Sequence, residues 1–353
     1  MHEIALSRKP PARSVALRSR HSPCLLCTAQ NYQQVTWQEE SFRRMADRDW
    51  DAVSGTMEAV VRGELSSLPG GDERGAVPRG LPEPRLDFKD RRHTWALTVA
   101  YFGPAFASFA WQKDRPLDSV MGAVDAAIEP FLGGKAIRLA SAGRTDRGVS
   151  AVGQLLSFPT FEDVTADELR QALDSIRPGA LRLIDARKVS RQFHAQFSAS
   201  WRRYIYLLPL APHEDELVPV IDAQLAPLVG DTHSYAALGR QLPKGKNALC
   251  TLHAARASRV ALPSFDGGDG AEVAAARIEL VGDRFLRRQV RTLVATALHT
   301  ASTAPDDTHD LLRRATSGEQ RLTAPPAPPE GLCFAEAGYT PWVSCGLAEP
   351  HKL

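Results

Sequence analysis

The sequence is short of several features that would assign it to a particular class of protein. Its five cysteines are scattered, so the disulfide framework of a small secreted domain is missing and a reducing compartment is expected. Only Cys24 and Cys27 have the spacing of metal ligands, and no second Cys-x-x-Cys or Cys-x-x-His pair completes a zinc site. No apolar run is long enough to span a bilayer, and no phosphate-binding loop occurs. We therefore expect no membrane segment, no metal and no cofactor.

Net charge is also low, at +2, and this leaves the class of partner open because the local distribution of charge decides nucleic-acid binding. The proportions of hydrophobic residues (43%) and charged residues (24%) are those of an ordinary globular protein. A chain of 353 residues can hold two domains, or one large domain with extensions.

Residues 1–91 differ in composition from the rest and are interpreted as an N-terminal extension. Acidic residues are missing between Glu3 and Glu39, whereas arginine, lysine and serine are frequent. This composition is typical of an organelle transit peptide and equally of a basic disordered tail. The protein is therefore expected inside the cell, either in a mitochondrion or plastid or in the nucleus or cytoplasm. Residues 49–65 are predicted to form one amphipathic helix, followed by a linker rich in proline, glycine and charge.

The hydrophobic periodicity of residues 92–200 predicts the order strand, helix, strand, strand, helix, strand. The strands are expected at residues 94–102, 136–141, 154–158 and 181–189, and the helices at 118–132 and 165–176. Thr165 and Glu168 have the spacing of a capping box at the start of the second helix. This order is that of the ferredoxin-like split βαβ motif, an α+β arrangement in which helices cover one face of a largely antiparallel sheet.

Residues 201–345 are predicted to form a second, similar half, with residues 346–353 as a tail. Its strands are expected at 201–208, 253–262, 272–281 and 332–339, and its helices at 231–242, 284–301 and 306–316. Two such halves can share one continuous sheet with a cleft between them. The long helix would carry Arg284, Arg287, Arg288 and Arg291 on one basic face. Such a face is often only solvated; it can also follow a phosphate backbone or turn one arginine inward to a buried carboxylate.

The loop Ala142 to Ala151 contains one carboxylate, Asp146, between Arg144 and Arg147 and between two glycines. Glycines permit a tight turn, and arginines can bind phosphates or hold a neighbouring carboxylate in its charged form. A carboxylate presented on such a loop can act as a nucleophile facing a cleft. Alternatively, Asp146 only accepts hydrogen bonds from the backbone amides of its own turn.

Five segments of residues 93–340 occur in one order that is typical of a known family. They are Tyr101 with Gly103 and Trp111-Gln112; Gly143-Arg144-Thr145-Asp146 with Gly148-Val149 and Gly153-Gln154; Phe193 to Ala199 leading into Arg203-Tyr204-Ile205-Tyr206; Phe285-Leu286 with Val290-Arg291; and Ala327 to Leu332. Together they resemble the TruA family of tRNA pseudouridine synthases. The sequence Val149-Ser150-Ala151 is closer to eukaryotic members than to bacterial ones.

The chain departs from the family pattern at several positions. Phe102 stands where the family usually has Asp, and Ala110 where it usually has Gly. In the arginine-bearing segment, Gln289, Thr292 and Ala295 replace Met, Asn and Gly. None of these departures removes a group that the reaction needs, but they leave specificity for the site in tRNA and local packing open.

The resemblance implies a cofactor-independent isomerase that converts uridine to pseudouridine in the anticodon stem-loop of tRNA. It implies that Asp146 is the essential carboxylate, either adding to C1′ of the ribose or removing a proton from C2′. Arg144 would hold the space left by the flipped base or a neighbouring phosphate, Tyr204 would stack on the uracil, and Arg291 would pair with Asp146. Without the family, Tyr204 would be interpreted as a half-buried aromatic of a strand.

Further implications concern the RNA and the assembly. Arg147, Arg284, Arg287 and Arg288 are expected to contact the RNA backbone, and family members are usually homodimers. His194 is assigned a structural hydrogen bond rather than the part of a general base. Two alternatives remain: a catalytically silent RNA-binding paralogue serving as a ribonucleoprotein subunit, and an unrelated two-domain ferredoxin-like enzyme acting on a small molecule.

Overall fold

The computed structural model describes residues 35–71, 80–83, 92–135, 139–243, 245–265 and 272–342. The segment that was predicted to be a transit peptide or a basic tail lies outside these residues. The chain divides into two compact units, residues 1–36 and 37–353, and the description below concerns the second. Among the helices of the described ranges, none is both long and apolar enough to cross a membrane.

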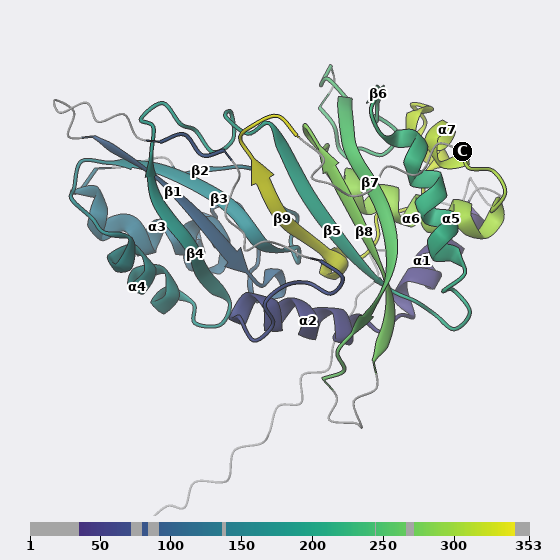
Figure 1. Ribbon diagram of the computed structural model, residues 1–353, viewed down its shortest axis with the longest axis horizontal. Coiled ribbons are helices and arrows are strands. Elements are labelled where there is room, and N and C mark those ends of the chain that lie inside the picture. Colours follow the sequence, from purple (N-terminus) through teal and green to yellow (C-terminus); the bar gives the residue numbers. More distant parts are fainter. Residues whose placement is uncertain are drawn as a thin grey trace, which may run out of the picture. The chain divides into compact units, whose positions relative to one another are not determined.

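One nine-stranded sheet forms the framework of the described residues (Figure 1). Its strands are β1 (His93–Tyr101), β2 (Ala140–Ser141), β3 (Ser150–Thr160), β4 (Leu181–Val189), β5 (Trp201–Pro209), β6 (Thr232–Ser234), β7 (Leu249–Leu262), β8 (Val273–Gly282) and β9 (Leu332–Gly338). They lie in the order β4-β1-β3-β9-β5-β8-β7-β6, and β2 pairs with β3 beside this path. Only the pairing of β3 with β9 is parallel among these ladders. The expected α+β class with a mixed, mostly antiparallel sheet is confirmed.

The same strand order occurs twice in this sheet. The first half of the chain supplies β4-β1-β3-β2 and the second supplies β9-β5-β8-β7. When the four strands of each set are numbered along the chain, both sets have the spatial order 4-1-3-2. The two sets join where Ser150 and Ala151 of β3 lie opposite Cys333 and Phe334 of β9. The loop before β3 therefore opens at the junction of the two halves.

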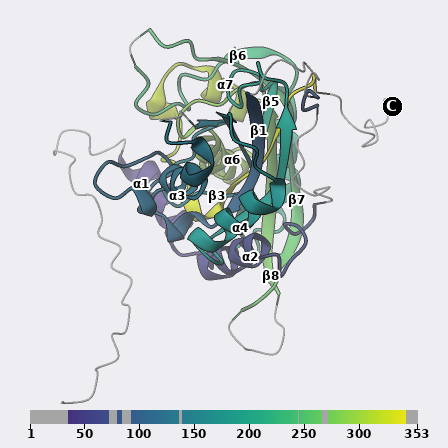
Figure 2. The same ribbon diagram turned by 90° about the vertical axis from the view of Figure 1, so that its left-hand side faces the viewer.

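Helices lie on both faces of the sheet. The second unit contains α2 (Trp50–Arg62), α3 (Val120–Ile128), α4 (Ala166–Ile176), α5 (Leu217–Leu225), α6 (Gln289–Thr303) and α7 (Asp310–Thr316), and α1 (Val35–Ala46) precedes them. Side chains alternate along a strand, so Tyr204 and Tyr206 share one core with α3 to α7, whereas Ile205 and Leu207 face the other way. Figure 2 shows α3 and α6 to one side of the strands.

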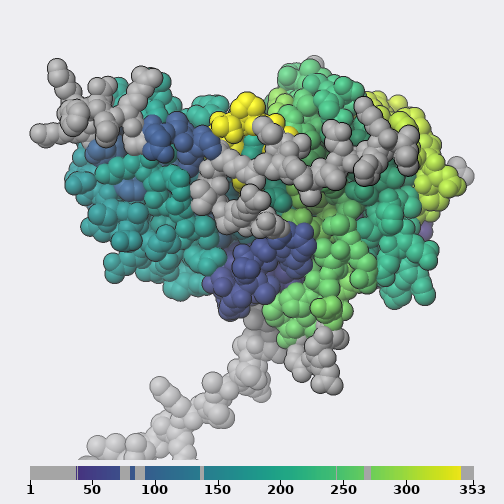
Figure 3. All heavy atoms as spheres, viewed as in Figure 1, coloured from purple at the N-terminus to yellow at the C-terminus, as the bar shows by residue number. Residues whose placement is uncertain are grey.

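Helix α2 covers part of the opposite face. Asp49 caps it by accepting a hydrogen bond from the Ala52 N–H (3.0 Å), and Gly63 ends it at a φ of 83°. Its buried residues Val53 and Met57 share a core with the outward-facing residues of the sheet. In Figure 3 this purple helix lies between the teal first half and the green second half. The helix expected within residues 49–65 is confirmed, and the domain boundary at residue 91 stays a prediction.

Most element predictions agree with the structure, and local signals explain why. The limits of β4 are those expected, and Thr165 and Glu168 form both hydrogen bonds of the capping box that starts α4. Helix α3 begins later than expected, because Ser119 rather than Asp118 accepts the capping hydrogen bond from the Gly122 N–H (3.1 Å).

The helix expected at residues 231–242 is wrong. Thr232–Ser234 instead pairs as β6 with the start of β7, and the Tyr235 N–H donates to the Ala248 carbonyl (3.0 Å). Burial of the Tyr235 ring fixes this segment against the sheet. The helix of this region is α5, where Val218, Ile221 and Leu225 are buried at helical spacing.

Candidate active site

The loop between β2 and β3 carries Asp146 and is held at its start by hydrogen bonds to β3. The Ala142 N–H donates to the Leu155 carbonyl (2.8 Å), and the side-chain amide of Gln154 donates to the Gly143 carbonyl (2.9 Å). These bonds join the loop to a central strand, so Asp146 stands on a rigid support.

A turn at Asp146 returns the chain to β3. The Val149 N–H donates to the Asp146 carbonyl (3.2 Å), and Gly148 has a φ of 83°, a conformation that favours glycine. Gly103, after β1, packs so closely that an added Cβ would lie 2.3 Å from the Val149 carbonyl oxygen. Its N–H donates to the Ser150 hydroxyl (3.0 Å). The loop is thus fixed from β1 as well as from β3.

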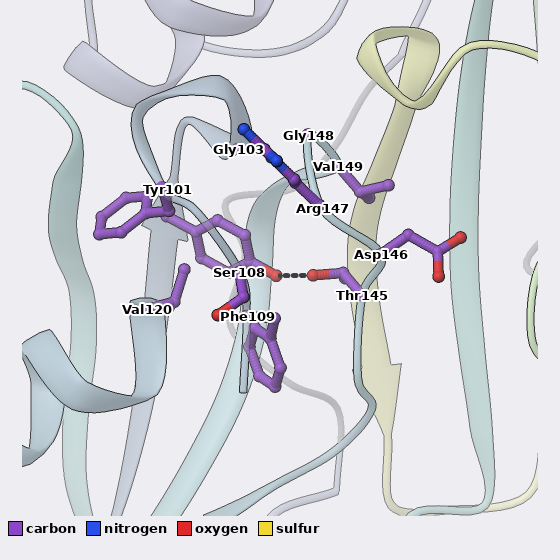
Figure 4. Close-up of a pocket in the computed structure, with 11 residues that line it drawn as sticks. Tyr101, Gly103, Ser108, Phe109, Val120, Thr145, Asp146, Arg147, Gly148 and Val149 are labelled. Atoms are coloured by element: carbon purple, nitrogen blue, oxygen red, sulfur yellow. Dashed lines mark hydrogen bonds between the residues drawn. The ribbon is translucent and has the colours of Figure 1, made fainter. Parts of the chain in front are cut away.

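Next to Asp146, Thr145 holds the loop against β1. Its hydroxyl lies 2.9 Å from the Tyr101 hydroxyl, in hydrogen-bond contact. Figure 4 shows this contact in a pocket also lined by Phe109, with the Asp146 side chain pointing away from both aromatic rings. Burial raises the pKa of Tyr101, and the Thr145 hydroxyl only partly offsets this shift, so the phenol stays neutral.

Arg291 from α6 forms an ion pair with Asp146. Its Nη1 donates to Asp146 Oδ2 (2.9 Å), and the two side chains are 12% and 22% exposed. Arg291 Nε donates to the Ala327 carbonyl (2.6 Å), while the Ala327 N–H donates to the Arg291 carbonyl (3.1 Å). One guanidinium therefore joins α6, the segment before β9 and the carboxylate.

Tyr204 of β5 lies in an aromatic frame beside the loop. Its ring makes edge contacts with Phe285 (centroids 5.0 Å apart) and Phe334 (5.1 Å). An added Cβ on Gly143 would lie 3.6 Å from its hydroxyl oxygen, so the loop passes close to this end of the phenol. Burial raises the pKa of Tyr204, and the negative charge of Asp146 adds to this effect, so the ring is neutral.

Arg144 and Arg147, which flank the carboxylate, are exposed. Neither forms an ion pair with any residue in the described ranges. Both guanidinium groups are therefore available to anions from solution.

The predicted basic helix face is wrong. Helix α6 begins only at Gln289, so Arg291 is helical whereas Arg284, Arg287 and Arg288 lie in the preceding segment. Arg288 has a left-handed φ of 64°, and the Gln289 side chain accepts the Leu286 N–H (2.7 Å) in place of a helical carbonyl. Within the described part of the chain, these three arginines have no carboxylate partner.

Arg202 was not singled out in the sequence, yet it joins three segments around the loop. Its guanidinium donates to the carbonyls of Ala142 (3.2 Å), Gln196 (2.9 Å), Ala199 (3.1 Å) and Asp283 (2.7 Å). Burial lowers its pKa, although the group remains a cation. Strand alternation offered a signal, because Arg202 lies two residues before Tyr204 and on the same face.

His194 has a hydrogen-bonding geometry that fits a structural function. Its Nδ1 accepts from the N–H groups of Gln196 (3.2 Å) and Phe197 (3.3 Å). These contacts close a turn before β5 and leave Nδ1 occupied, in line with the structural hydrogen bond assigned from the sequence.

A family model and the curated relatives of this chain agree on one family. A family model described as tRNA pseudouridine synthase matches residues 227–340. The chain is 32% identical to tRNA pseudouridine synthase A of Caulobacter sp. (strain K31) in an alignment 259 positions long that covers 69% of this chain and 97% of that protein. The proteins of the same name from Cereibacter sphaeroides and Thermus thermophilus are 33% and 29% identical, again over 69% of this chain and over 96% and 95% of their own lengths. Among solved structures, the RNA-bound CRISPR endoribonuclease Cse3 aligns with 66% of this chain and 100% of its own, at 13% identity and a TM-score of 0.18.

Proposed function

The chain belongs to the TruA family of tRNA pseudouridine synthases, and from this premise we propose that it isomerises uridine in the anticodon stem-loop of tRNA, with Asp146 as the essential carboxylate. Its activity as a tRNA pseudouridine synthase, an isomerase, follows from the family. The choice of uridine and the parts taken by individual residues are the proposal.

The contact between Asp146 and Arg291 is the observation that carries this assignment. The two residues are 145 positions apart in sequence, yet their side chains meet at 2.9 Å at the junction of the two halves. An ion pair of this kind orients the carboxylate while most of it is withdrawn from water. Tyr204, with its neutral ring, lies beside the same loop.

Pseudouridine formation breaks the N1–C1′ bond of uridine, turns the detached base and joins its C5 to C1′. The C5 hydrogen leaves as a proton and N1 gains one, so the reaction is an isomerisation without oxidation. Asp146 either adds to C1′ as a nucleophile or takes a proton from C2′ to give a glycal. Both routes need one ionised carboxylate above the ribose, and both need the base to be kept rather than replaced by water.

The target base is stacked in RNA and has to be flipped out before reaction. Tyr204 would stack on the flipped uracil, a contact worth about 1–3 kcal/mol for an aromatic ring and a base. Arg144 would fill the vacated space or hold the neighbouring phosphate. The Arg144 guanidinium is exposed and has no ion-pair partner among the described residues, which supports this function.

RNA backbone contacts are assigned to Arg147, Arg284, Arg287 and Arg288. Their lack of carboxylate partners within the described ranges supports the assignment, because an arginine free of an ion pair can neutralise a phosphate without losing a protein contact. Because α6 begins at Gln289, Arg284, Arg287 and Arg288 are presented by a loop rather than by a helix face, and their assignment is otherwise unchanged.

The finer description of the fold belongs to the same proposal. The repeated strand order supports two ferredoxin-like halves that share a sheet and form an RNA-binding cleft at their junction. A homodimer, as is usual in the family, and an intracellular location, where tRNA is found, complete the proposal. Light scattering of the purified protein tests the dimer.

Release of the C5 hydrogen tests the proposed function. Transcribed tRNA labelled with tritium at C5 of uridine should release tritium to water with the wild-type protein. Asp146→Asn keeps the size of the side chain and removes its charge, so the rate should fall at least ~1000-fold while tRNA binding stays within a few-fold. Tritium release by Asp146→Asn at the wild-type rate would contradict the part assigned to Asp146, and no release by either protein with tRNA still bound would favour a silent RNA-binding paralogue.

A further inference from the structure

Phe197 exposes 79% of its surface, more than any other large apolar residue of the described ranges. Single apolar side chains on a surface are common and need no explanation by themselves. Phe197 differs from such residues in two ways: its ring is rigidly supported, and it lies close to the loop that carries Asp146.

The support of Phe197 comes from the turn around His194. The two rings stack with centroids 4.3 Å apart and planes at 26°. The histidine ring is itself fixed, because its Nδ1 accepts two backbone N–H groups, and the Ser198 N–H donates to the His194 carbonyl (2.9 Å). One face of the phenyl ring is thus covered by the histidine and held in position. A partner that binds the other face therefore does not have to order the ring first.

Arg202 places Phe197 near the loop that carries Asp146. One guanidinium donates to the carbonyl of Gln196, the residue before Phe197, and to the carbonyl of Ala142, four residues before Asp146. Four residues of extended chain span at most ~14 Å. Stacked nucleotides of one strand are 3.4 Å apart, so a length of ~14 Å corresponds to about four nucleotides. The exposed guanidinium of Arg144 lies on the same stretch of chain.

We propose that Phe197 is a stacking platform for a second nucleobase of the RNA, a few nucleotides from the uridine that reacts. This inference rests on the proposed function and adds a contact outside the site of reaction. Because every base has a flat π face, stacking on Phe197 would strengthen binding without selecting a particular base. His194 would then serve as the rigid backing of the platform.

Four variants and one control test this proposal. Phe197→Ala and Phe197→Leu remove the aromatic ring, while Phe197→Tyr and Phe197→Trp keep one. Phe42→Ala is the matched control, because Phe42 is 61% exposed on α1 and far from this loop in sequence. Each protein is measured for its Kd with an unmodified tRNA transcript at several salt concentrations, and for KM and kcat.

We expect Phe197→Ala and Phe197→Leu to raise Kd and KM about tenfold with little change in kcat, and the Tyr and Trp variants to bind like wild type. The dependence of Kd on salt should keep its slope, because no charge is lost. The proposal is overturned if Phe197→Ala binds and reacts like Phe42→Ala, or if Leu substitutes as well as Trp. If the wild-type protein modifies no tRNA, the proposed function fails, and this inference fails with it; if it does and Phe197→Ala matches its KM, only the stacking contact is wrong.

Discussion

Asp146 and Arg291 depend on each other, because both side chains are largely withdrawn from water and each supplies the charge that the other faces. Arg291 also holds the Ala327 carbonyl through Nε. A guanidinium can make both contacts in one plane, whereas a lysine ammonium of similar charge cannot. Residues 146, 291 and 327 are thereby coupled, so a change at one of them should affect the other two.

Removing Arg291 should therefore harm stability as well as activity. Arg291→Ala leaves Asp146 without its ion pair, and we expect a loss of about 3 kcal/mol in the free energy of unfolding, measured by urea titration. In Asp146→Asn/Arg291→Ala, no charge is left unpaired, so the double variant should be more stable than Arg291→Ala alone. Additive losses in this double-mutant cycle would show that the two charges do not interact.

Arg202 is expected to position the loop of Asp146, and its neighbour Arg203 provides the control. Arg202→Lys cannot reach four carbonyls, so the loop should shift and kcat should fall at least ~10-fold with a smaller change in KM. Arg203 points to the opposite face, where it pairs with Glu279 (3.0 Å). Arg203→Lys should lower thermal stability and leave kcat unchanged. Equal kcat values for the two variants would rule out a positioning function for Arg202.

At the scale of the elements, close packing between β1 and the loop fixes the place of the carboxylate. A Cβ on Gly103 would meet the Val149 carbonyl oxygen at 2.3 Å, and backbone on both sides leaves little room for adjustment. The start of α6 shows a similar local control: Gln289, a departure from the family pattern, accepts the Leu286 N–H through its side chain. Both contacts set where Asp146 and Arg291 can meet.

Gly103→Ala should accordingly push the loop away from β1 and lower kcat at least ~10-fold. Gly134→Ala is the control, because its φ of 72° strains any other residue but no atom lies within 4 Å of the added Cβ. We expect that control to lose about 1 kcal/mol of stability and no activity. Steady-state kinetics with tRNA and thermal unfolding of both variants separate the two effects.

Sequence patterns predicted those elements whose signals are local. The capping box at Thr165 and the alternation of β4 depend on neighbouring residues, and both predictions are confirmed. The early start expected for α6 was wrong because the periodicity of its arginines continued through a segment that Arg288 interrupts with a positive φ. Contacts such as Tyr101 with Thr145 join residues far apart in sequence, and no spacing rule reveals them.

At the scale of the whole second unit, two sets of four strands meet at β3 and β9, with the loop of Asp146 at their junction and α2 packed on the opposite face. Ion pairs also tie this N-terminal segment to the second half. The buried Arg48 side chain donates to Glu214 Oε2 (2.6 Å) and Oε1 (3.0 Å). Residues 48–62 thus contribute to the core of the sheet although the sequence suggested an extension.

A substitution in α2 tests this contribution. Met57 is 1% exposed and shares a core with Ile205 and Leu207, so Met57→Ala should cost about 2–5 kcal/mol in the free energy of unfolding. Because Tyr204 faces the other side of the sheet, kcat of the folded protein should not change. Glu58→Ala, at the next and more exposed position of α2, should be close to neutral in both measurements. A loss of kcat in Met57→Ala at a temperature where it is fully folded would contradict this separation of the two faces.

The central claim, that Asp146 isomerises uridine in the anticodon stem-loop, is tested most directly by mapping pseudouridine with carbodiimide on total tRNA. The tRNA is incubated with the wild-type protein, with Asp146→Asn and with Phe42→Ala as an exposed-site control. The account predicts new pseudouridines in the anticodon stem-loop with the wild type and the control, and none with Asp146→Asn. Modification at those positions by Asp146→Asn, or modification by the wild type only outside the anticodon stem-loop, would contradict it.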